Sequence, residues 1–391
     1  MTIRLITAGE SHGPGLTTIV EGLPAGLELD QDAINRDMAR RQLGHGRGGR
    51  MKIERDRADV TAGVRHGRTM GGPIALQVPN RDYANWEERM NPWPVEADVP
   101  PVHLPRPGHA DLVGTWKYNT DDVRNILERA SARETAARVA GGALCKAFLH
   151  ALGVEIRSHV TQITSVRAPI PAEPLTVEDF DQVDESPVRC LDPHSTAAMV
   201  QEINTLRKAN ESLGGVFEVI AFGVVPGLGS HISWEERLDG RIAQAMMSIQ
   251  AMKGVGIGNG FDLAGVPGSQ AHDEIFYDDE RGYYRETNRA GGLEGGMTTG
   301  EPVVVRVGMK PIPTLTKPLR SVDIDSHEPA QALRERTDSC TVPAAGVVGE
   351  AMLAHVLADA YRRKFGGDHI DDVRAAVHAY EDRIGWQRQR V

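Results

Sequence analysis

The stretch "AGVVGEAMLAHVLADAYRRKFGG", residues Ala345 to Gly367, predicts a long helix that closes the hydrophobic core of the protein. A second long helix is expected in "RASARETAARVAGGALCKAFLHALG", from Ala132 to about Leu152. There Ser131 and Glu134 form an S-x-x-E capping box, and Gly153 is typical of a helix end. Strand-like segments separate the two helices and also precede them. The expected fold class is therefore α+β.

The remaining elements follow from local patterns. Strands are expected at residues 3–8, 16–22, within 52–64, within 72–80, and at 154–166, 215–225 and 301–309. Helices are expected at about 30–42, with Asp30 as cap, and at about 196–212. Another helix is expected to begin near Asp121 and Asp122. A further one should run from a Ser233–Glu236 capping box to about Met252. Residues 253–300 are dense in glycine and predict an irregular functional loop, and the six prolines of 91–107 predict a surface wrap. Since no linker is visible, we expect one domain over residues 1–391, with a C-terminal tail from about 380.

Length and composition exclude several classes of protein. The chain has 391 residues, 40% of them hydrophobic and 25% charged, which is ordinary for a soluble globular protein. No apolar run approaches the length of a membrane span, and the N-terminus lacks the features of a signal peptide. Three cysteines lie far apart and without metal-ligand spacing, so we expect buried thiols in the cytoplasm and no metal site.

The charge distribution favours a small anionic ligand over a nucleic acid. The formal net charge is −10, and aromatic residues make up only 5%, so a nucleic-acid-binding module is disfavoured. The basic residues are mostly arginine, 36 against 8 lysines, and arginine is the better bidentate donor to phosphate and carboxylate. Residues 40–68 hold nine basic side chains against three acidic ones. This local excess suits a site for a small anion, although a solvated basic surface fits the charge equally well.

The pattern "GESHG", Gly9 to Gly13, matches the G-x-S-x-G nucleophile elbow of serine hydrolases. That motif needs a strand, a sharp turn and then a helix, which would present Ser11 as nucleophile. Here the segment after Gly13 is rich in β-branched residues and predicts a second strand. A serine hydrolase is therefore the weaker alternative, and a polar hairpin turn is a further one.

Four other segments carry weak signals. Ser131 at a helix start lies beside Arg129 and Arg133, which is typical of an anion site, although a plain cap fits as well. The other three are "LPRPGHADL" with His109 near Asp111, "KPIPT" from Lys310, and "ERTDSC" with Arg336 near Asp338.

Taken together and in order, these motifs closely resemble the chorismate synthase family. The motifs are GESHG, "GHGRGGRM", "RPGHAD", "RASARETAARVA", "MSIQAMKGVGIGNGF", "NRAGGLEGGMTTGEPVVVRVGMKPIPT" and "RTDSC…GEAMLA", and they cover about residues 3 to 365. The resemblance implies a β-α-β sandwich of antiparallel sheets around a helical core, assembled as a homotetramer. It implies a lyase that removes phosphate from 5-enolpyruvylshikimate 3-phosphate by 1,4-anti elimination to give chorismate. Reduced FMN is the implied cofactor, with no net redox change, and NADPH is a candidate reductant.

The resemblance also implies roles for particular residues. The implied substrate site comprises Arg41, Arg47, Arg106, Arg133 and Arg336, of which Arg41 and Arg47 are also associated with NADPH. The implied FMN contacts are Arg129, Ala130, Ser131, Gln250, Ala251, Gly295, Lys310, Pro311, Ile312, Pro313, Thr314 and Arg336. His12 would protonate the departing phosphate and His109 the reduced flavin, tasks that suit a group titrating near neutrality. Asp338 would help remove the C6 proton, with Ser11 and Ser131 in proton relays.

Overall fold

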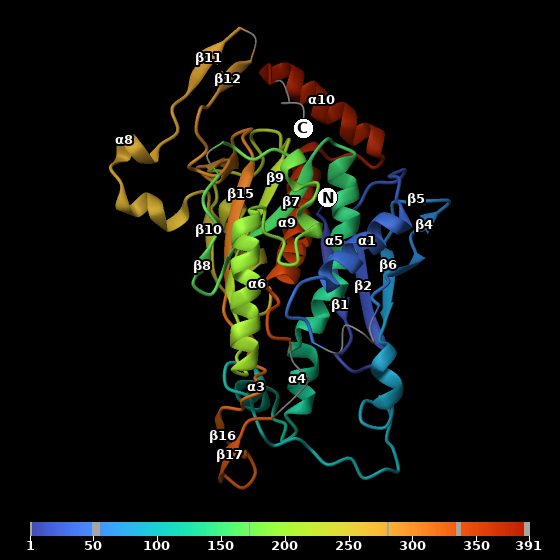
Figure 1. Ribbon diagram of the computed structural model, residues 1–391. Coiled ribbons are helices and arrows are strands. Elements are labelled where there is room, and N and C mark those ends of the chain that lie inside the picture. The colour runs from blue at the N-terminus through green and yellow to red at the C-terminus, as the bar shows by residue number, and fades with distance from the viewer. Residues whose placement is uncertain (1, 49–54, 172, 280, 334–337, 387–391) are drawn as a thin grey trace.

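Two antiparallel sheets and a set of helices form an α+β protein, as expected from the sequence. The computed structural model describes residues 2–48, 55–171, 173–279, 281–333 and 338–386 (Figure 1). The first sheet has the order β1-β2-β6-β3, with bounds Arg4–Ala8, Gly15–Glu21, Ile74–Pro79 and Asp59–Ala62. The second has the order β10-β15-β9-β7-β8, with bounds Met252–Ile257, Val303–Met309, Gly215–Phe222, Glu155–Ile163 and Val166–Arg167. Every strand pair in the two sheets is antiparallel.

Helices α5 (Thr135–His150) and α9 (Val342–Phe365) connect the two sheets. Helix α5 packs on β2 of the first sheet, α9 packs on β7 and β9 of the second, and the two helices pack on each other (Figure 1). Glycines permit the close approach: a Cβ on Gly142 of α5 would lie 2.3 Å from the Cβ of Ala351, and a Cβ on Gly349 of α9 would lie 2.8 Å from Phe217. One cluster of buried apolar side chains therefore extends through all of these layers.

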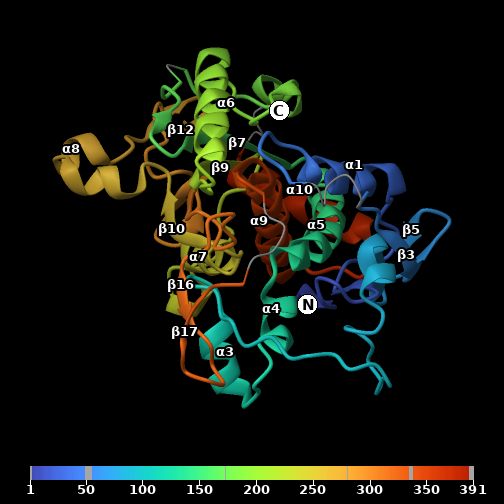
Figure 2. The ribbon, with the colours of Figure 1, turned by 60° about the horizontal axis from the view of Figure 1, so that its bottom comes forward.

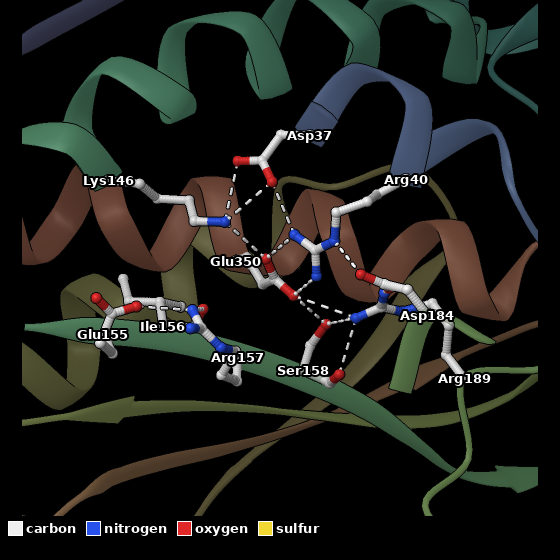
Figure 3. Close-up of polar contacts among 10 residues, drawn as sticks. All are labelled: Asp37, Arg40, Lys146, Glu155, Ile156, Arg157, Ser158, Asp184, Arg189 and Glu350. Carbon is white, nitrogen blue, oxygen red and sulfur yellow. Dashed lines mark hydrogen bonds and ion pairs between the residues drawn. The ribbon is translucent and has the colours of Figure 1, made fainter. Parts of the chain in front are cut away.

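A buried ionic cluster connects α1 (Gln31–Gln42) to helices α5 and α9 (Figure 3). The carboxylate of Glu350 on α9 is fully buried and accepts hydrogen bonds from Arg40 at 2.7 and 2.8 Å and from Lys146 at 2.9 Å. Asp37 pairs with Arg40 and Lys146, while Arg189 also contacts Glu350. Burial alone would raise the pKa of Glu350, but the surrounding cations bring it well below its usual value. The cluster fixes the end of α1, where Arg41 follows Arg40.

The remaining elements lie around this frame (Figures 1 and 2). The other helices are α3 (Asp111–Tyr118), α4 (Arg124–Ala130), α6 (Pro193–Lys208), α7 (Leu238–Met247), α8 (Gly268–Ala271) and α10 (Ile370–Ile384). The 3-10 turns are η1 (Arg81–Asn85), η2 (Ala132–Glu134), η3 (Glu178–Phe180), η4 (Val183–Glu185), η5 (Trp234–Glu236) and η6 (Gly260–Gly265). The short strands are β4 (Val64–Arg65), β5 (Arg68–Thr69), β11 (Phe276–Asp278), β12 (Gly282–Tyr284), β13 (Leu293–Glu294), β14 (Met297–Thr298), β16 (Arg320–Val322) and β17 (Pro329–Gln331).

Most predicted elements are present, but both predicted capping boxes are wrong. Asp30 caps α1 as expected, accepting from the N–H of Asp32. Ser131 accepts from Arg133 and opens only the 3-10 turn η2, because the carboxylate of Glu134 pairs with Arg138 instead of returning to the cap. Ser233 makes no capping hydrogen bond through its side chain, and Glu236 pairs with Arg363. In each case an arginine competes for the glutamate, Arg138 from one turn further along the chain, in α5, and Arg363 from the distant helix α9.

Three further expectations need correction. Residues 253–300 include most of β10, a full strand of the second sheet, and the short elements η6, α8 and β11 to β14, so the prediction of an irregular loop is wrong for these parts. Helix α3 was not predicted, because proline-rich sequence precedes it. By length and composition α9 is apolar enough to cross a membrane, contrary to expectation, but 94% of the relevant window is buried inside the protein, as in a core helix.

Candidate active site

The GESHG segment is the connection of a β-hairpin, which excludes the nucleophile elbow. Strand β1 before it pairs antiparallel with β2 after it, from Ala8 opposite Thr17 to Arg4 opposite Glu21. No helix follows Ser11 to present it as an elbow does. The side-chain amide of Asn80, at the end of β6, donates to the carbonyls of Gly13 at 2.7 Å, Glu10 at 3.1 Å and Ser11 at 3.4 Å. This one amide therefore fixes the shape of the turn.

His12 is held from two directions. Its Nδ1 lies 2.9 Å from both carboxylate oxygens of Glu128, and its backbone N–H donates to Glu128 Oε2, also at 2.9 Å. The imidazole stacks on the indole of Trp86, with ring centroids 4.0 Å apart and an interplanar angle of 24°. Burial alone would raise the pKa of Glu128, but His12 and Arg124 bring it below its usual value. An ionised carboxylate thus faces the imidazole.

Near the GESHG turn, two arginines from different elements share one buried carboxylate. Asp56 contacts Arg133 and also accepts from Arg41 at 3.0 Å. Arg133 donates in addition to the side-chain oxygen of Asn80 at 2.9 Å. The hydroxyl of Ser131 donates to that of Ser11 at 3.2 Å, so the two serines predicted as proton relays are in contact. Burial, with Arg133 and Arg47 nearby, lowers the pKa of Arg41 to about 10, although Asp56 opposes this.

Asp338 holds the loop that follows α1. Its carboxylate contacts Arg47 at 3.2 Å and accepts from the backbone N–H of Gly48 at 2.5 Å. Gly46 has φ +93°, and a Cβ there would lie 3.0–3.2 Å from Ile203 and Cys340, so glycine is required at this position. Arg336, predicted for both substrate and FMN, lies outside the described residues.

The second predicted acid, His109, has its own buried carboxylate. Asp111 is fully buried and lies 2.5 Å from His109 Nδ1, and it accepts from Arg106 Nε at 2.8 Å. Burial alone would raise the pKa of Asp111, but hydrogen bonds from His109 and Arg106 hold it at about 2. The preceding proline-rich segment is anchored by Ser321 of β16, which donates to the carbonyl of Pro105. His109 and Arg106 are therefore positioned by one rigid carboxylate.

A series of hydrogen bonds connects the His109 loop to the β1 hairpin. Lys310 Nζ donates to the carbonyl of Gly108 at 2.6 Å, and its backbone N–H donates to the carbonyl of Ala251 at 3.0 Å. Gln250 donates to Glu134 at 3.1 Å, and Glu134 accepts from Thr7 of β1 at 2.7 Å. Burial, followed by the charge of Lys253, lowers the pKa of Lys310. Candidate substrate and flavin residues thus border one continuous region.

The predicted flavin residues do not all meet. Arg129 donates to the backbone carbonyls of Thr7 and Gly9, which places it and the adjoining Ala130 and Ser131 beside the hairpin. Lys310 and Pro311 line a cavity of about 420 Å³ at one end of the strands of the second sheet, and the Ile312 carbonyl accepts from Ser212. Pro313 and Thr314 continue the same segment, half-buried.

Gly295 lies apart from these residues. It belongs to the β13–β14 turn. The carbonyl of the next residue, Gly296, accepts from Leu238, the first residue of α7, whereas Gln250 lies beyond Met247, the last residue of that helix. A helix of ten residues spans about 15 Å. The structure therefore separates Gly295 from Gln250 by the length of α7.

Four functional candidates were missed by sequence reasoning, namely Asp56, Asn80, Trp86 and Glu128, and Asp111 was noted only as a neighbour of His109. Each is defined by what it contacts, and most of these contacts join segments more than fifty residues apart. The signal for Asp111 was closest, since it lies two residues from His109. Asp56 was visible only as one of three acids in a basic stretch.

Comparison with known proteins gives a consistent result. The family model described as chorismate synthase matches residues 3–361. A protein named chorismate synthase from Desulforudis audaxviator is 56% identical over 384 residues, covering 98% of each chain. One from Alkaliphilus metalliredigens is 52% identical over 377 residues, covering 96% of this chain and 99% of its own. A solved structure titled "Crystal Structure of Chorismate Synthase" superposes with a TM-score of 0.79 at 44% identity, covering 98% of both chains.

Proposed function

The chain belongs to the chorismate synthase family, and from this premise we propose that the residues around the β1 hairpin form its active site. The reaction is the elimination of phosphate from 5-enolpyruvylshikimate 3-phosphate, which gives chorismate. The observation that carries the site proposal is the sharing of Asp56 by Arg41 and Arg133, of which Arg133 is joined to the GESHG turn through Asn80. One carboxylate fixes two buried guanidinium groups. Together they form a preorganised receptor for an anion that carries more charge than this carboxylate.

In this proposal the arginines bind the anionic groups of the substrate, which carries a phosphate and two carboxylates. Arg41 and Arg133 share Asp56, Arg106 is held by Asp111, and Arg47 by Asp338. The aspartates hold each guanidinium group in place before the substrate binds, so less side-chain entropy is lost on binding. Arg336 is proposed for the same site from the resemblance alone.

The acid and base groups follow the same pattern. His12 donates a proton to the departing phosphate. Ser11 and Ser131 take part in the proton relays, which their contact at 3.2 Å supports. His109 holds a proton beside the cofactor, and its Nδ1 is fixed by Asp111. Asp338 assists removal of the C6 proton. Alanine in place of His12 or His109 should lower turnover by about 10²- to 10⁴-fold.

The residues present fit a flavin mononucleotide. The side-chain oxygen of Gln250 is buried and has no hydrogen-bond partner among the residues that the structure describes, so it can accept from a ligand N–H. Arg129 and Lys310 supply positive charge for a phosphate. The FMN site would then include Arg129, Ala130, Ser131, Gln250, Ala251 and Lys310 to Thr314, with Gly295 and Arg336 retained from the resemblance. Reduced FMN, when bound, supplies electron density that promotes C–O cleavage and is recovered, so no net oxidation results.

The wider organisation is also inferred from the family. The packing of α5 and α9 on opposite sheets supports a β-α-β sandwich, and the shared apolar core supports one domain over residues 1–391. We keep the C-terminal tail from about residue 380 in this proposal, and its first residues belong to helix α10, which ends at Ile384. We further propose a cytoplasmic homotetramer that binds no nucleic acid or membrane, with NADPH as reductant near Arg41 and Arg47.

The test measures chorismate and reductant together in a sealed anaerobic assay. With FMN reduced beforehand, we expect many turnovers per flavin and no further consumption of reductant. With oxidised FMN in air we expect no activity. One reductant consumed per chorismate, or full activity in air, would contradict the proposed role of the cofactor.

A further inference from the structure

The carboxylate of Glu134 joins three segments of the chain at the candidate flavin site. Its Oε1 accepts from the hydroxyl of Thr7 on β1 at 2.7 Å, and its Oε2 accepts from Nε2 of Gln250 at 3.1 Å. Arg138, in the first turn of α5, donates to Oε2 at 2.8 Å and also donates to the hydroxyl of Ser248 at 2.7 Å. Only 6% of the Glu134 side chain is exposed, so these contacts are little screened by water.

These contacts fix which way the side-chain amide of Gln250 faces. Burial alone would raise the pKa of Glu134, but Arg138 and Thr7 bring it below its usual value. An ionised carboxylate only accepts hydrogen bonds, so the nitrogen of the amide must face it. A rotated amide would place its oxygen against a carboxylate oxygen, where the lone pairs repel. The other end of the amide, Oε1, is buried and has no hydrogen-bond partner among the residues that the structure describes. Gln250 therefore presents an acceptor to a ligand.

The backbone that carries Gln250 is held in place as well. It lies in a tight turn, in which the N–H of Met252 donates to the carbonyl of Ile249 at 3.3 Å. Ala251 in this turn has φ +70°, in the left-handed region that normally favours glycine. Its carbonyl accepts from the N–H of Lys310 at 3.0 Å. A strained alanine persists only where its surroundings fix the turn, so Gln250 is presented from a defined position.

We propose that Glu134 is a positioning residue of the flavin site, which fixes the amide of Gln250 so that its Oε1 accepts a hydrogen bond from a ring N–H of bound FMN. The inference rests on the placement of Gln250 at the flavin in the proposed function. A phosphate presents chiefly oxygen acceptors, so it does not suit Oε1 and suits the cation of Arg129 instead. The ribityl hydroxyls are the other donors of the cofactor, and the spectrum of the bound ring separates the two.

The first measurement is the binding of oxidised flavin, without substrate or turnover. Gln250→Leu removes the acceptor, so it should raise the Kd of FMN about 2- to 10-fold, as expected for one hydrogen bond. Riboflavin, which lacks the phosphate, should be weakened by the same factor. The visible absorption spectrum of bound FMN should also change, because a hydrogen bond to the ring perturbs its electronic transitions. A weakening confined to FMN, or weaker binding with an unchanged spectrum, would assign the contact to the phosphate or the ribityl chain and overturn the proposal.

The second measurement is a double-mutant cycle with riboflavin as the ligand. Riboflavin is used because Glu134 also contacts Thr7, whose hydroxyl accepts from Arg129 at 2.8 Å, and Arg129 is proposed for the phosphate. Glu134→Gln keeps the size of the side chain but removes the charge that orients the amide, so it should raise the Kd of riboflavin at least about twofold. In the Gln250→Leu background the same change should have little further effect, because the amide through which it acts is absent. Additive effects would overturn the proposal.

Glu218 provides a matched control. Its side chain is 10% exposed, lies 3.0 Å from His159 and pairs with Arg306, and none of these three is a candidate flavin residue. Glu218→Gln should leave the Kd of riboflavin and the spectrum of bound FMN unchanged. A weakening equal to that in Glu134→Gln would mean that loss of any buried carboxylate disturbs the site, which contradicts a specific role of Glu134.

The outcomes also separate this inference from the proposed function. An unchanged Kd and spectrum in Gln250→Leu would remove Gln250 from the flavin site, which is a failure of the proposed function and removes the role of Glu134 with it. Weaker binding in Gln250→Leu with additive effects in the cycle retains the site and rejects Glu134 alone. If Glu134→Gln does not fold, Glu134→Asp takes its place in the cycle, since it retains the charge beside Arg138 but shortens the reach to Gln250.

Discussion

At the residue scale, the candidate substrate site depends on arginine in particular. Arg47 is fixed by Asp338, and its planar fork can bind an anion through two parallel hydrogen bonds that lysine cannot reproduce. A charged hydrogen bond contributes about 1.5–3 kcal/mol, so Arg47→Lys should weaken substrate binding at least several-fold by calorimetric titration. Arg57→Lys is the control, because Arg57 is 64% exposed and its ion pair among the described residues is with the nearby Asp59. Unchanged affinity in both Arg41→Lys and Arg47→Lys would remove these residues from the site.

The carboxylate of Asp56 is expected to matter for stability as well as binding. Asp56→Asn leaves Arg41 and Arg133 as two buried neighbouring cations without the charge they share. Breaking a buried ion pair costs about 3–5 kcal/mol, which urea unfolding should show as a lower free energy of unfolding. Asp59→Asn removes an exposed carboxylate and should change that free energy by less than about 0.5 kcal/mol. An equal decrease in the free energy of unfolding in the two variants would show that the contact of Asp56 with the two arginines contributes no more than an exposed ion pair.

At the scale of elements, the packing of α5 on α9 sets a limit on side-chain size. A Cβ at position 142 would lie 2.3 Å from the Cβ of Ala351 and 2.6 Å from its Cα, so Gly142→Ala must push the helices apart. Overpacking costs about 1–3 kcal/mol, which exceeds the gain of about 1 kcal/mol from replacing glycine in a helix.

Gly240 in α7 is the matched control, since no described atom beyond its chain neighbours and its own helix backbone lies within 4 Å of the position of its Cβ. Gly240→Ala should raise the free energy of unfolding by about 0.4–1 kcal/mol, because only the helix propensity changes. The two alanine variants should therefore move thermal midpoints in opposite directions. A stabilised Gly142→Ala would mean that the helix contact is looser than the geometry indicates.

Elements of strong local pattern were predictable, and those defined by distant partners were not. Asp30 caps α1 through its own backbone neighbour, so a local motif was sufficient. Glu134 seemed to form a capping box with Ser131, but Arg138, Thr7 and Gln250 occupy its carboxylate. Strand β10 is glycine-rich and gains its structure from pairing with β15, which its own sequence does not indicate.

At the scale of the whole molecule, buried carboxylates should make the fold sensitive to acid. A carboxyl group whose pKa is lowered by folding contributes stability above its unfolded pKa, and loses it as the pH falls through the folded pKa. Asp111, with a pKa of about 2 against an ordinary 3.8, should contribute about 2 kcal/mol at neutral pH. Glu128, Glu134 and Glu218 also have lowered pKa values, through their histidine and arginine partners.

The free energy of unfolding should therefore fall as the pH drops from about 5 to about 2. Urea unfolding at a series of pH values measures it, and Asp111→Asn should show a shallower decline. A free energy that stays constant down to about pH 3 would contradict the ionised state of these buried groups.

Residue types and their order were enough to establish the α+β class, the long central helices, the family and its reaction, since each rests on local periodicity or on motif order along the chain. Folding established which charges meet. His12 and Glu128 are 116 residues apart, and Arg133 and Asp56 are 77 apart, yet each pair is in contact. Long-range pairing depends on how α5 and α9 bring the two sheets together, and no local pattern encodes that geometry. The buried carboxylates that orient the acids and arginines became visible only in the tertiary structure, because a buried charge is stable only beside the partner that compensates it.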